Sequence, residues 1–427
     1  MSAQDLSNPK ESAGRTIGTP WVQLVAGLLG MMMISSCQYA WTLFVPALTE
    51  THKWSLPVIQ LAFTLFICFM TYAAPLTGYL LDKFGTRLFF TLAGLFVGVG
   101  WGALGFVKSL WGLYFFYSLA GLGASCIYTG GIATALRWFP DKRGFASGVM
   151  AAGFGSGAAP FIPVIGYLLS THGHAAAFLY TGIFFGVVLL IVAQVLRFPP
   201  KTPTPAASSS QSAPKKAEEL MGLSPLEMLK RPQFYLIYLI FVGMATGYLM
   251  VTAQTRPFGK ECGLAANIIV LAITFNSIGN GLGRVVWGFL SDKLGRERSM
   301  FIDFLICALA VTLLPILGKN PIMFIVLLFI AMFSFGPIFA FFPPVTADRF
   351  GTTYLATNYG FVYSAKGVGG VFGGWVSSFI ILSFGWGFTF YGAAGLGIIS
   401  ALGALVLMRI PKPVLKPTPV LSRPESA

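Results

Sequence analysis

Long apolar segments are the feature that most constrains the fold of this chain. A helix that crosses a bilayer needs about 20 mostly apolar residues, because the hydrocarbon core is roughly 30 Å thick. Twelve segments of the sequence meet this requirement. They cover about residues 21–46, 57–81, 88–107, 110–136, 145–170, 175–196, 233–254, 266–290, 299–317, 321–345, 355–382 and 386–408. We therefore expect an all-α membrane protein with twelve transmembrane helices.

Composition and charge favour the same class. The chain is 56% hydrophobic and only 10% charged, whereas soluble domains are about one quarter charged. In a soluble protein, the net charge of +14 would suggest binding to nucleic acid. With both termini on one side of the membrane, however, 21 Lys and Arg residues fall on that side and five on the other. This distribution predicts cytoplasmic termini, a lipid bilayer as partner and no nucleic acid.

The residues between the sixth and seventh segments divide the chain in two. They are rich in Pro, Ser, Ala and Lys, which predicts a flexible linker with one short helix near Ser224–Leu229. The expected organisation is a cytoplasmic tail at 1–20, a six-helix bundle at 21–197, a cytoplasmic linker at 198–232, a second six-helix bundle at 233–410 and a disordered cytoplasmic tail at 411–427. A monomer suffices for this architecture.

A short motif follows the second segment and recurs 210 residues later, after the eighth. Its residues are Gly78, Asp82, Lys83, Gly85 and Arg87 in the first copy, and Gly288, Asp292, Lys293 and Gly295 in the second. The glycines permit tight turns, the acids pair at helix ends, and the basic residues hold the loop in the cytoplasm. A single copy is also compatible with an ordinary basic turn, but two matched copies favour duplication of a six-helix unit.

The first copy of this motif resembles the signature loop of the major facilitator superfamily. Three further runs resemble the oxalate/formate antiporter family within it, together with Arg284. These runs are Gln38-Tyr39-Ala40-Trp41, the stretch from Arg137 to Gly144, and Asn358-Tyr359-Gly360-Phe361 with Lys366. The resemblance implies two pseudosymmetric six-helix bundles with a carboxylate site between them, alternating access by rocking, and a bacterial inner membrane.

Two cations fall deep inside the predicted helices. Arg284 is about eight residues from the end of its segment, roughly 12 Å, and Lys366 is about eleven residues into its own, roughly 16 Å. A charge at this depth costs about 2.5 kcal/mol or more, so it normally faces a cavity on a transport pathway. The alternative is a structural cation paired with a carboxylate. The acid nearest to that role, Asp303, is only about four residues into the ninth segment.

Two such cations without a resident acid predict an anion-binding site. Arg284 is suited to clamp a carboxylate through two parallel hydrogen bonds, and Lys366 supplies a second point charge. A small dianion satisfies both cations, whereas a monocarboxylate leaves one positive charge unmatched. Electrostatics therefore favours an oxalate-like dicarboxylate, in agreement with the resemblance.

Polar and aromatic residues complete the predicted site, with packing between helices as the alternative role of each aromatic. They are Gln38, Tyr39, Trp41, Tyr128, Asn280, Tyr363, Phe335 and Phe339. The oxalate transporter of the family carries larger polar aromatics at the positions of Phe335 and Phe339, and a tryptophan in place of Tyr363. Formate, lactate, pyruvate and malonate therefore remain candidate substrates.

Exchange of small carboxylates is the leading functional prediction, and proton-coupled symport of a monocarboxylate such as lactate or pyruvate is the alternative. Proton coupling usually needs a titratable carboxylate or histidine in the core, but His52, His172 and His174 lie in loops or at their edges. Enzyme motifs such as His-Glu-x-x-His and Gly-x-Ser-x-Gly are absent. We expect no enzymatic activity, no cofactor and no metal.

Overall fold

The computed structural model describes residues 19–74, 76–77, 80–81, 86–139, 143–199, 222–351 and 354–413. Within these ranges the regular structure is helical, and the one β-interaction is an isolated bridge between Gly222 and Gly351. Nine helical runs in the described residues are long and apolar enough to cross a membrane, and Leu56–Tyr72 is a shorter apolar helix. The protein is an integral, multi-pass membrane protein, as its sequence predicts.

The described helices follow the order of the predicted segments. In the first half they are α2 (Pro20–Tyr39), α3 (Trp41–His52), α4 (Leu56–Tyr72), α6 (Thr86–Ala103), the 3-10 turn η1 (Leu104–Phe106), α7 (Leu110–Trp138), α8 (Arg143–Ser156) and α9 (Phe161–Val195). In the second half they are α10 (Pro225–Leu229), α11 (Pro232–Glu261), α12 (Ala266–Leu294), α13 (Arg296–Leu317), α14 (Pro321–Phe335), α15 (Ile338–Phe350), α16 (Leu355–Tyr363), α17 (Ala365–Gly370), the π-helix η3 (Val371–Val376) and α18 (Ser377–Arg409).

Two of the helical runs each contain two crossings. The run Gly148–Val195 has 48 residues and the run Thr357–Arg409 has 53, far more than one crossing needs. Gly173 interrupts the first with φ 76° and ψ 174°, and Gly385 interrupts the second with φ 80° and ψ 175°. A positive φ is accessible to glycine without steric cost, so the chain reverses there. With these two reversals the nine runs give eleven crossings, and the shorter apolar helix Leu56–Tyr72 corresponds to the remaining predicted segment.

Several predicted segments, which the sequence prediction treated as continuous, contain breaks. The first breaks at Ala40 between α2 and α3, and the fifth at residues 157–160 between α8 and α9. The tenth breaks at Gly336 and Pro337 between α14 and α15, and the eleventh at Ser364 between α16 and α17. Pro337 lacks an N–H group and cannot continue the hydrogen bonding of α14. Apolarity alone does not reveal these breaks, because the residues on both sides are equally apolar.

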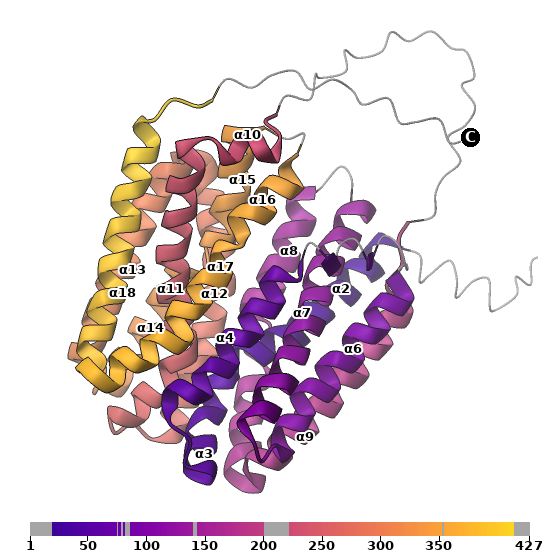
Figure 1. Cartoon of the computed structure of the whole chain (residues 1–427), viewed down its shortest axis with the longest axis vertical. Helices are drawn as coiled ribbons and strands as arrows, with labels where there is room; N and C mark the ends of the chain where they lie inside the picture. The colour runs from indigo at the N-terminus through magenta and orange to yellow at the C-terminus, as the bar shows by residue number, and fades with distance from the viewer. Residues whose placement is uncertain are drawn as a thin grey trace, which may run out of the picture.

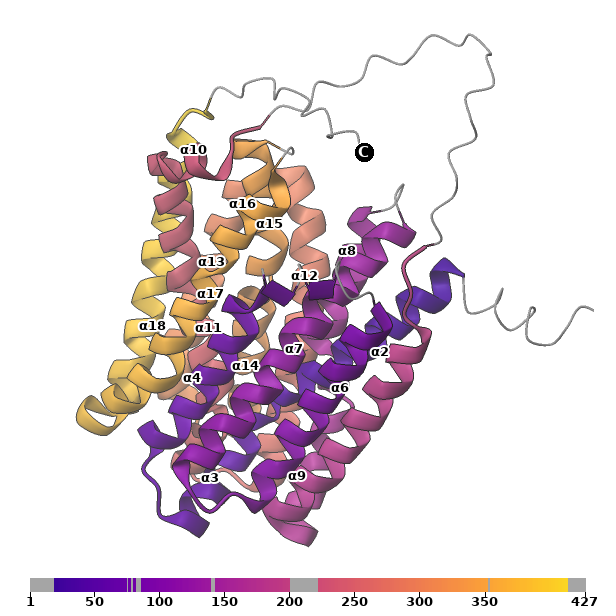
Figure 2. The same cartoon turned by 45° about the vertical axis from the view of Figure 1, so that its right-hand side comes forward.

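The helices form two bundles that lie side by side (Figures 1 and 2), in agreement with the predicted fold class. In the first bundle α6 packs on α9 and α4 on α7; in the second, α13 packs on α18 and α12 on α14. The bundles meet where α8 contacts α12 and where α4 and α3 contact the second bundle. The approach of α8 and α12 requires a small residue, since a Cβ at Gly281 would lie 2.5 Å from the Cβ of Ser156.

The second copy of the repeated motif joins α12 to α13. Gly295 ends α12 with φ 92°, Asp292 forms an ion pair with Arg296, and the Lys293 ammonium lies 4.5 Å from the centre of the Phe289 ring. Gly288 lies inside α12. In the first copy, Gly78, Asp82, Lys83 and Gly85 lie outside the described residues. Arg87 is described, and its Nε donates to Gln194 Oε1 at 2.6 Å.

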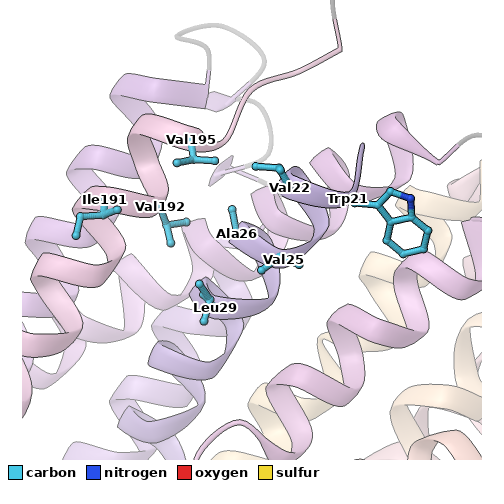
Figure 3. A pocket seen from close by; sticks show the side chains of 8 residues that line it. All are labelled: Trp21, Val22, Val25, Ala26, Leu29, Ile191, Val192 and Val195. Carbon is cyan, nitrogen blue, oxygen red and sulfur yellow. The ribbon is translucent and has the colours of Figure 1, made fainter. Parts of the chain in front are cut away.

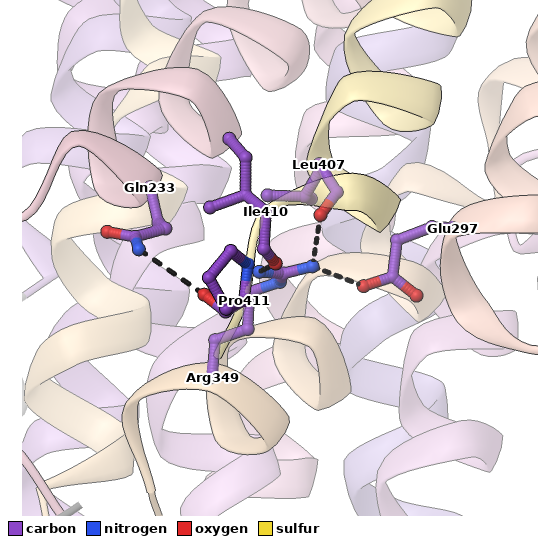
Figure 4. A network of polar contacts seen from close by, with 6 residues as sticks. All are labelled: Gln233, Glu297, Arg349, Leu407, Ile410 and Pro411. Carbon is purple, nitrogen blue, oxygen red and sulfur yellow. Dashed lines mark hydrogen bonds and ion pairs between the residues drawn. The ribbon is translucent and has the colours of Figure 1, made fainter. Parts of the chain in front are cut away.

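A polar network fixes the end of the second bundle near α10 (Figure 4). The buried Arg349 of α15 donates to Glu297 of α13 at 2.9 Å and to the carbonyl oxygens of Leu407 and Ile410. Gln233 Nε2 donates to the Pro411 carbonyl oxygen at 3.5 Å. These contacts tie α11, α13 and α15 to the end of α18.

The short linker helix is also present. Ser224 caps α10 and forms a capping box with Glu227, which confirms the predicted helix near Ser224–Leu229. Just before it, the Leu223 amide donates to the Phe350 carbonyl oxygen at 2.8 Å, and Asn358 Nδ2 donates to the Leu223 carbonyl oxygen at 3.0 Å. The linker from 200 to 221 and the tail from 414 onward lie outside the described residues.

Candidate anion-binding site

The two predicted cations converge on one place between the bundles. Arg284 on α12 is 4% exposed and Lys366 on α17 is fully buried. Both approach the same two aromatic rings. The centre of the Phe339 ring lies 4.6 Å from Arg284 Cζ and 5.6 Å from Lys366 Nζ, and that of the Phe154 ring lies 5.9 Å and 5.4 Å from the same two atoms. The structure therefore brings these two predicted site residues together.

Neither cation has a carboxylate partner in the part of the chain that the structure describes. The ion pairs found there involve Arg296, Arg349 and Lys260, and no acid pairs with Arg284 or Lys366. Asp303 is also buried, but it lies beside Ser334, between α13 and α14. The Nη2 atom of Arg284 is buried without a hydrogen-bond partner among the described residues. A buried guanidinium with an unused donor favours an anion.

Two side-chain amides hold the cations. Lys366 Nζ donates to Gln38 Oε1 at 3.2 Å, so an ammonium of the second bundle is held by a residue of the first. Arg284 Nε donates to Asn280 Oδ1, also at 3.2 Å, which confirms that the two residues share a face of α12. The other end of the Arg284 guanidinium crosses to α8, where Nη1 donates to the Ala151 carbonyl oxygen at 2.9 Å.

The amides meet at a pair of tyrosine hydroxyl groups. Tyr39 and Tyr248 are hydrogen bonded to each other. Asn280 Nδ2 donates to the Tyr39 hydroxyl at 2.7 Å and to the Tyr248 hydroxyl at 3.4 Å. Gln38 Nε2 donates to the Tyr248 hydroxyl at 3.2 Å. We call the residues Gln38, Tyr39, Tyr248, Asn280, Arg284 and Lys366 the polar cluster.

Aromatic rings surround the polar cluster. Tyr128 of α7 stacks on Tyr363 of α16 with ring centres 5.9 Å apart and an interplanar angle of 14°. The ring centres of Tyr363 and Phe339 are 6.0 Å apart, and those of Phe335 and Tyr248 are 6.3 Å apart. Lys366 Nζ lies 5.8 Å from the centre of the Tyr363 ring, so the Tyr128–Tyr363 stack lies beside Lys366. Four of the predicted aromatic residues therefore lie around the polar cluster, and their ring faces offer flat walls for a planar anion.

Trp41 is the predicted site residue that the structure does not bring to the polar cluster. Its indole Nε1 donates to Gln60 Oε1 at 3.2 Å, and its ring stacks on Tyr117 with centres 4.3 Å apart. Gln60 in turn donates to the Ala253 carbonyl oxygen at 2.9 Å. Trp41 follows the break at Ala40, which separates it from Gln38 and Tyr39 and turns it toward α4 and α7. Its contacts are those of helix packing.

Sequence reasoning missed Tyr248 and Phe154. Tyr248 is fully buried and contacts three members of the polar cluster. A signal for it was present, because Tyr248 is 210 residues after Gln38, the same offset that separates the two copies of the repeated motif. Phe154 lies in a glycine-rich stretch of α8 that gives no comparable signal.

A hollow elsewhere in the structure has a different character from the polar cluster. It lies between α2 and α9 and is lined by apolar side chains (Figure 3). The lining residues are Trp21, Val22, Val25, Ala26, Leu29, Ile191, Val192 and Val195. None belongs to the polar cluster, and such a surface suits lipid chains rather than a carboxylate.

Comparisons with known proteins show the family of the chain. The sequence profile of the Major Facilitator Superfamily matches residues 25–265 and 235–425. The chain is 38% identical to the oxalate:formate antiporter of Oxalobacter formigenes over 416 residues, which is 96% of this chain and 97% of the relative. It is 27% identical to an uncharacterized transporter of the superfamily from Escherichia coli strain K12, covering 83% and 86% of the two chains. Monocarboxylate transporter 12-B of Danio rerio is 22% identical, covering 69% and 67%.

Proposed function

This chain belongs to the Major Facilitator Superfamily and to its oxalate/formate antiporter family, and we propose that it exchanges small carboxylates across the membrane. The favoured pair is an oxalate-like dicarboxylate against formate or a similar monocarboxylate. The similarity to the oxalate:formate antiporter over nearly the whole of both chains supports exchange rather than catalysis.

The observation that carries the proposal is the pair of buried cations without a carboxylate among the described residues. An uncompensated charge in a low-dielectric interior is costly. A dianion neutralises both cations at once, and Arg284 presents an unused Nη2 donor to it. The guanidinium then clamps one carboxylate, while Lys366 binds the other. Tyr128, Tyr363 and Phe339 form flat walls around a planar substrate.

The position of the polar cluster supports alternating access. Gln38 and Tyr39 belong to the first bundle, whereas Tyr248, Asn280, Arg284 and Lys366 belong to the second. Rocking of the bundles separates these two groups and opens the site to one side of the membrane at a time. Substrate exchange then needs no ATP and no cofactor.

The proposed placement of the domains and termini follows the distribution of basic residues. The start of α2 and the end of α18 lie toward the same end of the molecule, which is also the end of the second bundle that holds α10 (Figure 1). We assign this end to the cytoplasm, in a bacterial inner membrane, because the excess of Lys and Arg belongs to it. Residues 21–197 and 233–410 form the two bundles, joined by the linker 198–232, and a monomer suffices for transport.

The test is uptake of labelled oxalate into proteoliposomes that contain the full chain and are preloaded with formate, oxalate, lactate or buffer alone. We expect uptake only into vesicles that contain a counter-anion, and the most effective preload identifies the exchange partner. Uptake of lactate or pyruvate into empty vesicles under an inward proton gradient would instead establish proton-coupled symport. Absence of carboxylate transport under every condition would overturn the proposal.

A further inference from the structure

We propose that Tyr248 is a positioning residue that sets the spacing of Arg284 and Lys366 and so selects the length of the dicarboxylate. This inference rests on the function proposed above. Tyr248 does not contact either cation directly through a hydrogen bond in the structure. It contacts the two amides that do, Gln38 and Asn280.

The hydrogen bonds form a continuous relay between the cations. Lys366 Nζ donates to Gln38 Oε1 at 3.2 Å, and Gln38 Nε2 donates to the Tyr248 hydroxyl at 3.2 Å. From the other side, Arg284 Nε donates to Asn280 Oδ1 at 3.2 Å, and Asn280 Nδ2 donates to the Tyr248 hydroxyl at 3.4 Å. Each amide therefore turns its oxygen to a cation and its nitrogen to the same phenol.

The chemistry of the phenol fits this central place. A tyrosine hydroxyl has one proton to donate and lone pairs with which to accept. Tyr248 accepts from Gln38 and Asn280, which leaves its own proton for Tyr39. If either amide were turned around, its N–H₂ group would face a cation and its oxygen would face the phenol. The cations, which only donate, hold the amide oxygens, and the phenol holds the amide nitrogens. Buried networks of this kind are rigid when every member is satisfied.

Fixed cations discriminate between dicarboxylates of different length. Arg284 and Lys366 repel each other, and without the relay each side chain adjusts its position to the anion that enters. With the relay, the separation of the two charges is set as the bundles close around the anion. A two-carbon dianion and its three-carbon homologue differ by one methylene, which such a site is able to distinguish by about 10–200-fold.

The relay is complete only when the bundles are together. Gln38 and Tyr39 come from α2, while Tyr248 and Asn280 come from α11 and α12. When the bundles separate, the contacts from Gln38 to Lys366 and from Gln38 and Tyr39 to Tyr248 are lost. Selection by length therefore acts as the site closes around the anion. We expect it to affect the exchange of dicarboxylates rather than their initial binding to the open site.

The test is Tyr248→Phe, which removes the hydroxyl and keeps the ring against Phe339, 5.6 Å away between centres. The matched control is Tyr117→Phe. Tyr117 is also fully buried, and its hydroxyl donates to the Cys37 carbonyl oxygen at 2.8 Å, away from the polar cluster. Both variants are reconstituted with the wild-type protein, and the half-saturation constants for exchange of oxalate, malonate and formate are measured.

We expect the malonate-to-oxalate ratio of half-saturation constants to fall about tenfold in Tyr248→Phe, the effect of about 1.4 kcal/mol from one hydrogen bond in a charged network. The half-saturation constant for formate should change much less, because formate binds only one cation. Tyr117→Phe should keep the wild-type malonate-to-oxalate ratio. An unchanged ratio in Tyr248→Phe overturns the inference.

If Tyr248→Phe does not reach the membrane, Tyr39→Phe takes its place. It removes the partner hydroxyl that receives Asn280 Nδ2 at 2.7 Å, and the ratio should move in the same direction. An unchanged ratio in that variant also overturns the inference. A wild-type protein that exchanges no carboxylate would refute the proposed function instead, so the two failures are distinct.

Discussion

Gln38 and Tyr248 lie 210 residues apart in the chain, and the Gln38 amide nitrogen donates to the Tyr248 hydroxyl at 3.2 Å. Glu50 and Lys260 have the same separation and form an ion pair at the far end of α3 and α11. The repeated motif has this offset too. Equivalent residues of a duplicated unit meet where the pseudo-two-fold axis passes between the bundles. The axis therefore runs between the first and seventh segments, and the polar cluster lies beside it.

Lys366→Gln should abolish exchange of dicarboxylates while the protein still folds. Removing one partner of a buried charge interaction costs about 2–5 kcal/mol, which corresponds to a loss of roughly 30-fold or more in affinity for the anion. Oxalate exchange in proteoliposomes measures the loss. Lys260→Gln is the control, because Lys260 pairs with Glu50 on the surface and should retain activity. Normal exchange by Lys366→Gln would remove Lys366 from the site.

Arg284→Lys should be severe although the charge is kept. An ammonium has no planar fork for a carboxylate, and it is too short to keep the contact of Nη1 with the Ala151 carbonyl oxygen. We expect the half-saturation constant for oxalate to rise by roughly tenfold or more, the loss of at least one charge-assisted hydrogen bond. The control is Arg296→Lys, because Arg296 lies at the start of α13 and pairs with Asp292. Unchanged affinity in Arg284→Lys would identify Arg284 as a structural cation.

The crossings and the two cations could be predicted from the sequence, because both are recognised from a short stretch of neighbouring residues. A run of apolar residues predicts a crossing, and a charge within the run is conspicuous at any depth. The breaks at Ala40 and Ser364 leave no such signal, since a broken helix and a continuous one are equally apolar. The expected place of Trp41 in the site assumes a continuous first segment, whereas the break at Ala40 turns Trp41 away from Gln38.

The lining of the site was only partly predictable. Asn280 is recognisable because it is four residues before Arg284, and residues at this spacing share a helix face. The role of Tyr248 is harder to predict, because it depends on contacts between two bundles that are far apart in the sequence. Its position is found by adding the 210-residue offset to Gln38. This step assumes that equivalent residues of the two duplicated halves lie next to each other in the structure.

Cys262 provides a test of orientation. It lies just after α11, at the opposite end from α10, whereas the other four cysteines lie within the predicted crossings. If the termini are cytoplasmic, a membrane-impermeant maleimide added from outside should label intact cells, and Cys262→Ser should abolish the labelling. Labelling only in inverted vesicles would reverse the assigned orientation.

The rate of that labelling should depend on pH in a defined direction. Burial raises the pKa of the Cys262 thiol, the nearby charge of Glu261 raises it further, and Lys319 opposes both. Because the thiolate is the reactive form, a raised pKa lowers its fraction at neutral pH. The labelling rate should therefore be lower than that of a free cysteine near pH 7 and should continue to rise above pH 9.0, the ordinary value. A plateau below pH 9.0 would contradict this expectation.

Gly336→Ala should disturb the site from the break between α14 and α15. A Cβ at this position would lie 2.5 Å from the Asn280 carbonyl oxygen and 2.6 Å from its Oδ1 atom, which accepts from Arg284. Overpacking of this kind costs about 1–3 kcal/mol, so we expect lower thermal stability and weaker oxalate binding together. Gly395→Ala in α18 is the control, since nothing lies within 4 Å of its added Cβ. Equal stability of the two variants would show that α14 moves away without cost.

Asn280→Asp should change which anions the site prefers. The substitution is nearly isosteric and places a carboxylate at 3.2 Å from Arg284 Nε, where the Asn280 oxygen now accepts. One of the two positive charges is then neutralised from within, and a dianion in the site would bring one negative charge too many.

We expect the half-saturation constant for oxalate to rise by roughly tenfold or more, on the scale of a single charge interaction inside a protein. Formate should be affected less, because one cation is enough for a monoanion. The measurement is inhibition of labelled formate exchange by unlabelled oxalate and by unlabelled formate in the same vesicles. Equal loss for both anions would mean that the introduced carboxylate disrupts the relay as a whole, whereas undiminished inhibition by oxalate would show that Arg284 does not contribute its charge to the bound dianion.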